Sequence, residues 1–231
     1  MVAHYIAKRS YFLVEIIESK KSRQEISSDD FLALCQTYPK VHIDFGTGDG
    51  MFALRRARKV EDELVIGLDA DRDSLVTGAT KAAKKPAKGG AANVRYVCAN
   101  AIELPDDFAH PVADTFSINF PWGSLLDVTV LADEDFLSGI KKCLKDRAIG
   151  DIYVNLFALQ DSETLRTNHL PEITAETLES HVKPLWEKAG FKWLEHQFFA
   201  SGEKVDVAST WASRLTKGSG RATVYWKVEV L

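Results

Sequence analysis

Apolar runs of strand length recur along the chain, and segments with amphipathic helical spacing lie between many of them. Seven runs are expected to be strands: Val41 to Phe45, Leu64 to Leu68, Val94 to Ala99, Thr115 to Phe120, Ile149 to Phe157, Phe191 to Phe199 and Ala222 to Val230. This alternation predicts a Rossmann-like α/β fold: a seven-stranded, mostly parallel sheet with helices on both faces. The last two strands would close the sheet as an antiparallel hairpin.

The helices have recognisable ends. The segment Asp133 to Lys145 is helical in pattern, and Thr174 is a good N-cap for a helix that reaches Lys188. A short helix is expected near Val205 to Leu215, while Asp161 to Glu172 has mixed polarity and a Leu-Pro step typical of a loop.

The N-terminal part is harder to interpret, because the apolar run Tyr11 to Ile17 fits a strand or a helix equally well. A helix is expected over Phe31 to Tyr38, with Ser28 or Asp29 as its cap. We therefore expect an extension of uncertain structure at residues 1–26, followed by a single domain at residues 27–231.

Composition narrows the class of protein. The 231 residues are 45% hydrophobic and carry a net charge of −4, which argues against a protein that coats nucleic acid with its whole surface. Cys35, Cys98 and Cys143 lie far apart in apolar stretches, so buried thiols are expected rather than disulfides or a zinc site. No apolar run has membrane-spanning length and the start does not resemble a signal peptide, which indicates a cytoplasmic protein without a membrane partner.

Candidate chemistry begins at the turn after the first predicted strand. Gly46, Gly48 and Gly50 follow Asp44 in a G-x-G-x-G spacing, which favours S-adenosylmethionine over a dinucleotide with its G-x-G-x-x-G pattern. Asp69 ends the second strand, where its carboxylate can accept both ribose hydroxyls. The alternative is a tight turn kept for folding, with Asp69 capping the next helix.

Tryptophans supply a second candidate site. Trp122 lies in the turn Asn119 to Gly123 after the fourth strand and could stack on a planar substrate, although tryptophan is also a common core residue. Trp211 follows Ser209 in the late helix, so two indoles could hold a flipped base. Trp186, Trp193 and Trp226 fit apolar positions and are interpreted as structural.

Basic residues form two groups. Lys84, Lys85 and Lys88 end a helix in a glycine-rich loop, and Arg214, Lys217, Arg221 and Lys227 border the last helix and hairpin. Either group could bind phosphates, and the first could equally be a solvated helix end. The histidines lack metal-ligand spacing, so no metal is predicted.

Several motifs together resemble the aminoglycoside-resistance 16S ribosomal RNA methyltransferases that modify N1 of adenine 1408, the Kam and Npm group. The resemblance runs from about Ile26 to the C-terminus. It is carried by four segments: Val41 to Gly50, Lys84 to Gly90 with Asn93, Phe120 to Leu126 and Ser209 to Leu215.

The resemblance implies a class I methyltransferase fold, a monomer, and 16S rRNA within the 30S subunit as the partner. It implies that the cofactor is held by Asp44, Gly46, Thr47, Gly48, Asp69, Ala101, Ile102, Ser124 and Leu125. Trp122 and Trp211 would hold the flipped adenine, with Ser209 orienting the second indole, and rRNA phosphates would be bound by Lys84, Lys85, Lys88, Arg214 and Arg221. Ile102 and Ser219 depart from the family pattern, which usually has glutamate and a basic residue there.

The chemistry leaves two alternatives open. Adenine N1 carries a lone pair, so its methylation requires alignment but no general base. However, Asn119-Phe120-Pro121-Trp122 also matches the spacing of an Asn-Pro-Pro-Tyr motif, which would favour methylation of an exocyclic amine. A non-catalytic ribosome-binding or assembly protein that retains the fold is the competitor from another class.

Overall fold

A computed structural model describes residues 13–105, 108, 110–167, 172–200, 203 and 222–231. Its centre is one mixed sheet with the strand order β2-β1-β5-β4-β3-β6-β7-β9-β8. The strands are β1 (Leu13–Ile17), β2 (Arg23–Ser27), β3 (Lys40–Phe45), β4 (Glu63–Asp69), β5 (Val94–Cys98), β6 (Ala113–Asn119), β7 (Leu144–Asn155), β8 (Phe191–Phe199) and β9 (Thr223–Val230). Strands β5, β4, β3, β6 and β7 pair in parallel, which confirms the predicted α/β class.

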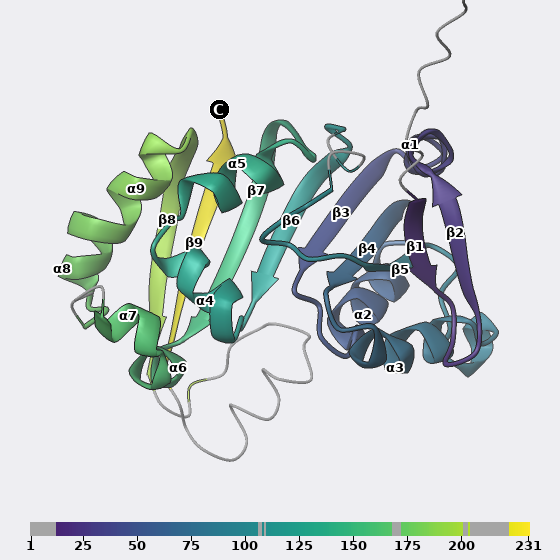
Figure 1. The fold of residues 1–231 in the computed structure, drawn as a ribbon, viewed down its shortest axis with the longest axis horizontal. Coiled ribbons are helices and arrows are strands. Elements are labelled where there is room, and N and C mark those ends of the chain that lie inside the picture. Colours follow the sequence, from purple (N-terminus) through teal and green to yellow (C-terminus); the bar gives the residue numbers. More distant parts are fainter. Residues whose placement is uncertain (1–12, 106–107, 109, 168–171, 201–202, 204–221) are drawn as a thin grey trace, which may run out of the picture.

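The two ends of the sheet are antiparallel. Strand β9 pairs antiparallel with β7 and with β8, as the predicted C-terminal hairpin requires. At the other edge, β1 and β2 form a second antiparallel hairpin that joins the sheet through Ile16 and Val97 (Figure 1). The sheet therefore has nine strands in the described residues rather than seven. The two additional strands are β1 and β2, so the expected boundary at residue 26 lies inside β2.

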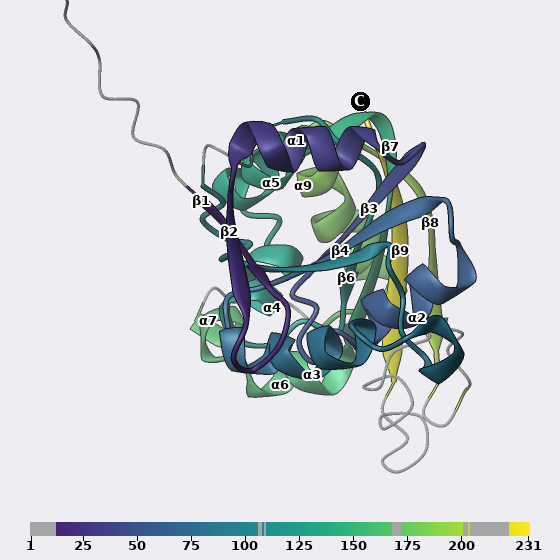
Figure 2. The same cartoon turned by 90° about the vertical axis from the view of Figure 1, so that its right-hand side faces the viewer.

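Helices cover both faces of the sheet. Those of the described residues are α1 (Ser28–Gln36), α2 (Met51–Lys59), α3 (Arg72–Ala82), α4 (Gly123–Val130), α5 (Glu134–Lys141), α6 (Leu156–Asp161), α7 (Glu163–Thr167), α8 (Ala175–Thr177) and α9 (Lys183–Lys188). Figure 1 shows α4, α5 and α9 over the half of the sheet that contains β7 to β9, and Figure 2 shows α1 and α3 at opposite ends of the N-terminal half. The core accordingly forms two buried clusters, and the smaller one packs α2 and α3 against β4 and β5.

Several predicted ends differ in detail. Ser27 rather than Ser28 or Asp29 caps α1, since its side chain accepts the Asp30 N–H at 3.1 Å. Thr174 is the predicted cap, but the helix behind it passes through a π-helical turn at Leu178–Val182 before α9. The segment interpreted as a loop contains α7, and the predicted helix near residues 205–215 lies outside the described residues.

The burial of the cysteines and of three tryptophans can be compared with the predictions from the sequence. Cys35 and Cys143 are buried and Cys98 is half-buried, all three as free thiols. Trp186 and Trp226 are buried and pack edge-to-face with ring centres 6.0 Å apart, while Trp193 stacks on Trp226. These three tryptophans are structural, as predicted.

Candidate functional site at the carboxyl edge of the sheet

The turn after β3 is built from glycines in a left-handed conformation. Gly46, Gly48 and Gly50 have φ angles of 73°, 58° and 69°, which residues with a Cβ atom rarely adopt. A Cβ on Gly50 would lie 2.3 Å from Cε1 of Tyr96 on β5, so this ring also excludes a side chain there. The turn is fastened to β4 because the N–H groups of Gly46 and Thr47 donate to the Leu68 carbonyl at 2.8 and 2.9 Å.

Asp69 fixes the other side of this turn. One carboxylate oxygen accepts the Gly48 N–H at 2.8 Å and the other accepts the Asp71 N–H at 2.9 Å. A carboxylate has about four lone-pair positions, so each oxygen keeps capacity for a further donor. The Asp69 carboxylate thus both holds the glycine turn and can accept two hydroxyl groups from a ligand.

A cavity of about 300 Å³ opens beside the glycine turn. Its lining residues within the described ranges are Asp44, Gly46, Thr47, Gly48, Asp49, Phe52, Asp69, Ala70, Asn100, Ala101, Ile102, Asn119, Phe120, Pro121, Trp122, Ser124 and Leu125. All nine predicted cofactor residues and Trp122 are among them. The structure therefore brings together residues that the sequence separates by about eighty positions.

Sequence reasoning did not assign a role to Asp49, Phe52, Ala70 or Asn100, which also line this cavity. Asp49 and Phe52 lie in or directly after the glycine turn, and Ala70 follows Asp69. Their positions beside residues already assigned to the cofactor could have indicated that they line the cavity. In the segment that departs from the family pattern, Asn100 accepts the Ile102 N–H at 3.1 Å through its side-chain oxygen. Asn100 thus provides a polar side chain next to the apolar Ile102.

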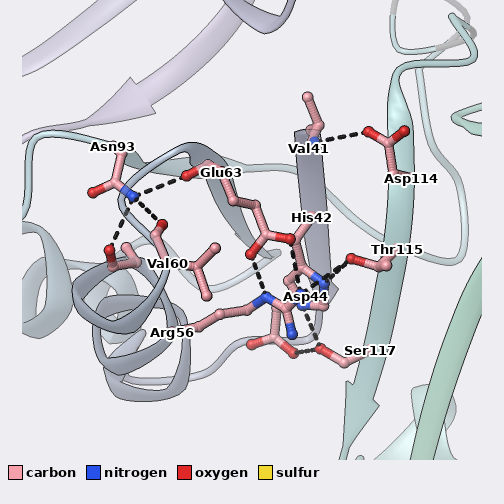
Figure 3. Close-up of polar contacts among 11 residues, drawn as sticks. Val41, His42, Asp44, Arg56, Val60, Glu63, Asn93, Asp114, Thr115 and Ser117 are labelled. Carbon is pink, nitrogen blue, oxygen red and sulfur yellow. Dashed lines mark hydrogen bonds and ion pairs between the residues drawn. The ribbon is translucent and has the colours of Figure 1, made fainter. Parts of the chain in front are cut away.

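Asp44 is the buried acid of the site, with 1% of its surface exposed. Its Oδ1 accepts hydrogen bonds from Ser117 Oγ at 2.6 Å and from Asn119 Nδ2 at 2.8 Å (the Ser117 contact is drawn in Figure 3). Its Oδ2 is buried and has no hydrogen-bond partner among the described residues. Burial raises the pKa of Asp44 to about 6, although the hydrogen-bonding side chains of Ser117, Thr47 and Asn119 and the positive charge of Arg56 lower it.

The turn after β6 presents Trp122 at the opposite wall of the cavity. Phe120 has a φ of 52°, which is strained for a residue with a Cβ, and its N–H donates to the Tyr153 carbonyl at 2.8 Å. Trp122 is the N-cap residue of α4 and has 41% of its surface exposed, so it is not a core residue. An exposed indole beside a ligand cavity is a suitable surface for a flat substrate.

Asn119 connects the two walls of the cavity. Its Nδ2 group donates to Asp44, and its Oδ1 is buried without a partner among the described residues. The Nδ2 group therefore supports the buried acid, while Oδ1 is the atom that could accept a hydrogen bond from an exocyclic amine, so this geometry leaves the exocyclic-amine alternative open. Through Nδ2, Asn119 links the turn after β6 to Asp44 in the lining of the cavity.

The remaining predicted site residues lie elsewhere. Lys84, Lys85 and Lys88 are exposed around a short 3-10 turn, Pro86–Lys88, and do not line the cavity. Ser209, Trp211, Arg214 and Arg221 lie outside the described residues. Within the described ranges, no three His, Cys, Asp or Glu side chains are grouped closely enough to hold a metal ion, and none of the helices has the length and apolarity needed to cross a membrane.

Comparison with known proteins gives a consistent result. A family model described as "NpmA: 16S rRNA (adenine(1408)-N(1))-methyltransferase" matches residues 15–230. A protein of that name from Streptoalloteichus tenebrarius is 32% identical over 206 residues, which cover 88% of this chain and 93% of that protein.

Two solved structures share the fold. A variant of the corresponding enzyme from Catenulisporales acidiphilia, solved with the cosubstrate SAM, superposes with a TM-score of 0.81 at 27% identity over 94% of this chain and 97% of that chain. The aminoglycoside resistance methyltransferase NpmB1 superposes with a TM-score of 0.77 at 30% identity over 94% of this chain and 100% of that chain.

Proposed function

The chain belongs to the 16S rRNA (adenine(1408)-N(1))-methyltransferase family, and from this we propose that it methylates N1 of adenine 1408 in the assembled 30S subunit, using S-adenosylmethionine. The observation that carries the proposal is that the glycine turn, Asp69 and Trp122 line one and the same cavity. By likeness to NpmB1, the modification confers aminoglycoside resistance. The enzyme acts as a monomer in the cytoplasm.

The cavity suits S-adenosylmethionine in three respects. Asp69 has free lone pairs for the ribose hydroxyls, Asp44 places a carboxylate in the cavity wall near a cationic group, and Ala101 and Ile102 offer an apolar wall to the adenine ring. Gly46, Thr47, Gly48, Ser124 and Leu125 complete the binding surface. When bound, the cofactor supplies a methyl group on a positively charged sulfur, which is a good leaving group.

The protein's own contribution to the reaction is alignment. Neutral adenine N1 already has a lone pair. No side chain therefore needs to remove a proton from the base before N1 attacks the methyl carbon. Trp122 stacks on the flipped adenine, and Trp211, oriented by Ser209, covers its other face, which compensates for the stacking lost in the rRNA helix. Lys84, Lys85, Lys88, Arg214 and Arg221 bind rRNA phosphates and position the subunit.

Mass analysis of nucleosides from treated 30S subunits tests the proposal. Purified 30S subunits are incubated with enzyme and S-adenosylmethionine, and the rRNA is digested at neutral pH, because 1-methyladenine rearranges to 6-methyladenine in alkali. The proposal expects 1-methyladenine. A product of 6-methyladenine would instead support the exocyclic-amine alternative, and cofactor binding without any transfer would support the non-catalytic one.

A further inference from the structure

A chain of polar side chains, buried at His42, Asp44 and Ser117 and half-buried at Thr115 and Arg56, runs along the face of β3 and β6 that α2 covers (Figure 3). His42 and Asp44 alternate on β3, and their register partners on the adjacent parallel strand are Thr115 and Ser117. Alternate residues of a strand share a face, so all four side chains lie on one side of the sheet. His42, Asp44 and Ser117 each expose no more than 2% of their surface.

The hydrogen bonds of this chain have one consistent direction. An ionised Asp44 only accepts, so Ser117 Oγ donates to it at 2.6 Å and is left to accept from His42 Nε2 at 3.0 Å. His42 therefore carries its proton on Nε2. Burial, with the nearby positive charge of Arg56, holds the pKa of His42 well below its ordinary value, so the ring is neutral and its Nδ1 is an acceptor.

The direction continues to the surface. Thr115 Oγ1 lies 2.8 Å from His42 Nδ1 and donates to it, which leaves Thr115 to accept from Arg56 Nη2 at 3.3 Å. Arg56 is anchored in turn by Glu63, whose two carboxylate oxygens accept from Nε at 2.6 Å and from Nη2 at 2.8 Å. Each hydroxyl in the chain both accepts and donates, an arrangement in which neighbouring hydrogen bonds strengthen one another.

The hydrogen-bonded chain ends at Asp44, whose two carboxylate oxygens have different surroundings. Oδ1 accepts hydrogen bonds from Ser117 and Asn119, whereas Oδ2 is fully buried, and the Thr47 hydroxyl also lowers the pKa of this carboxyl, whose side chain lines the cofactor cavity. A buried negative charge is costly unless hydrogen bonds or a nearby positive charge compensate for it. S-adenosylmethionine carries two cationic groups, an ammonium and a sulfonium, at its methionine end.

We propose that Arg56, Thr115, His42 and Ser117 form a one-way hydrogen-bond relay that keeps Asp44 ionised in the wall of the cofactor cavity, where its negative charge favours the cationic methionine end of S-adenosylmethionine. The proposal rests on the proposed function for the identity of the ligand. It makes His42, Thr115 and Ser117 positioning residues, because they act on the cofactor only through Asp44.

The charged and titratable groups facing Asp44 come from every element packed around it. They are His42 on its own strand, Arg56 on α2, Asp49 in the glycine turn, Asp69 at the end of β4 and Tyr96 on β5. The Ser117 hydroxyl contacts Asp44 and His42 alone among these groups. A change at Ser117 therefore tests Asp44 without altering the other charges directly.

The relay predicts a particular pH dependence of cofactor binding. Protonated Asp44 offers no negative charge, so affinity falls as the pH drops through the pKa of about 6, and binding near that pH releases about half a proton. Ser117→Ala removes a donor that favours the ionised form. The pKa of Asp44 then rises further, and the loss of affinity begins at a higher pH.

Calorimetric titration of the full-length enzyme with S-adenosylmethionine measures both quantities, in two buffers of different ionisation enthalpy, from about pH 5 to about pH 7.5. Ser117→Ala is expected to move the midpoint upward by about one pH unit, which weakens binding about fivefold at pH 6 and about twofold at pH 7. Thr115→Val, which interrupts the relay one step further away, moves it less. Ser117→Thr keeps the hydroxyl and restores the wild-type profile.

The outcomes separate the relay from a purely structural role. A folded Ser117→Ala enzyme with an unchanged midpoint and unchanged affinity overturns the relay, even if its melting temperature is lower. If that variant does not fold, a midpoint in Thr115→Val equal to that of the wild type overturns it instead. Failure of the wild-type enzyme to bind S-adenosylmethionine would contradict the proposed function and not the relay specifically.

Discussion

The two turns that face each other across the cavity are built in opposite ways. The turn from Asp44 to Gly50 is fastened by backbone hydrogen bonds to β4 and leaves no room for added side chains at Gly46 and Gly50. The turn from Asn119 to Gly123 instead presents Trp122 outward, and a Cβ on Gly123 would meet no atom of the described residues within 4 Å. The first turn is suited to holding a small ligand of fixed shape, and the second to receiving a large substrate. Substitutions should therefore separate cofactor binding from methyl transfer.

The largest effect is expected in the glycine turn, with Gly50→Ala. The left-handed backbone and the overlap with Tyr96 should together lower the free energy of unfolding by about 3 kcal/mol and abolish cofactor binding. Urea denaturation measures the first effect and calorimetric titration the second. Gly48→Ala is the matched control: φ is similar but no described atom lies within 4 Å of the new Cβ, so the cost should be about 1 kcal/mol. Equal losses in the two variants would show that the contact with Tyr96 is unimportant.

Asp44→Asn should separate stability from function. The pKa of Asp44 is raised from 3.8 to about 6, so its contribution to folding is greatest below pH 3.8 and declines as the pH rises through 6. Removing the charge should raise the free energy of unfolding at neutral pH by about 2 kcal/mol while weakening cofactor binding. Urea denaturation at several pH values should show the gain vanishing near pH 4. A variant that is less stable than the wild type at neutral pH would contradict this account of the buried acid.

Trp122→Ala tests the opposite turn. Loss of one stacking surface, worth about 1–3 kcal/mol, should reduce methyl transfer to 30S subunits by about 10- to 100-fold with cofactor affinity almost unchanged. Trp122→Phe, which keeps an aromatic face, should retain much of the activity. By resemblance, Trp211→Ala should behave like Trp122→Ala. Full activity in Trp122→Ala, or an equal loss of cofactor affinity, would remove the distinction between the two turns.

A smaller effect is expected from replacing Lys84, Lys85 and Lys88 together with alanine. Binding to 30S subunits should weaken and depend less steeply on salt, because fewer counterions are released when fewer phosphates are neutralised. The control is a triple alanine variant of Lys40, Lys142 and Lys192, exposed lysines away from the cavity lining. An unchanged salt slope in the first variant would indicate that its lysines are only a solvated helix end.

Much of the central sheet and of the cavity could be predicted from the sequence. The strands from β3 to β6 and the hairpin of β8 and β9 follow from apolar runs that neighbour turn residues, and the carboxyl ends of parallel strands must meet. Strand β2 could not be predicted in this way, because Arg23-Gln24-Glu25-Ile26-Ser27 is mostly polar and becomes a strand by pairing with β1. The pattern of apolar and polar residues within a segment does not show which other strand it will pair with.

The relay was missed for a related physical reason. His42 sits within an apolar run and contributes no separate motif, and its partners Thr115 and Ser117 lie more than seventy positions away. Single-residue patterns show that β3 is buried but not which polar groups meet across two strands. The distances identify the hydrogen-bonded partners, and the ionised Asp44 then fixes the direction of the hydrogen bonds.

Primer extension on 16S rRNA tests the central claim most directly. Intact 30S subunits and free 16S rRNA are each incubated with enzyme and S-adenosylmethionine, and reverse transcription is then run through the decoding region. Methylation at N1 blocks base pairing, so we predict a new stop at adenine 1408 in the rRNA from 30S subunits, much weaker in free rRNA and in Trp122→Ala reactions. Uninterrupted extension through adenine 1408, under conditions where the cofactor is bound, would contradict the account.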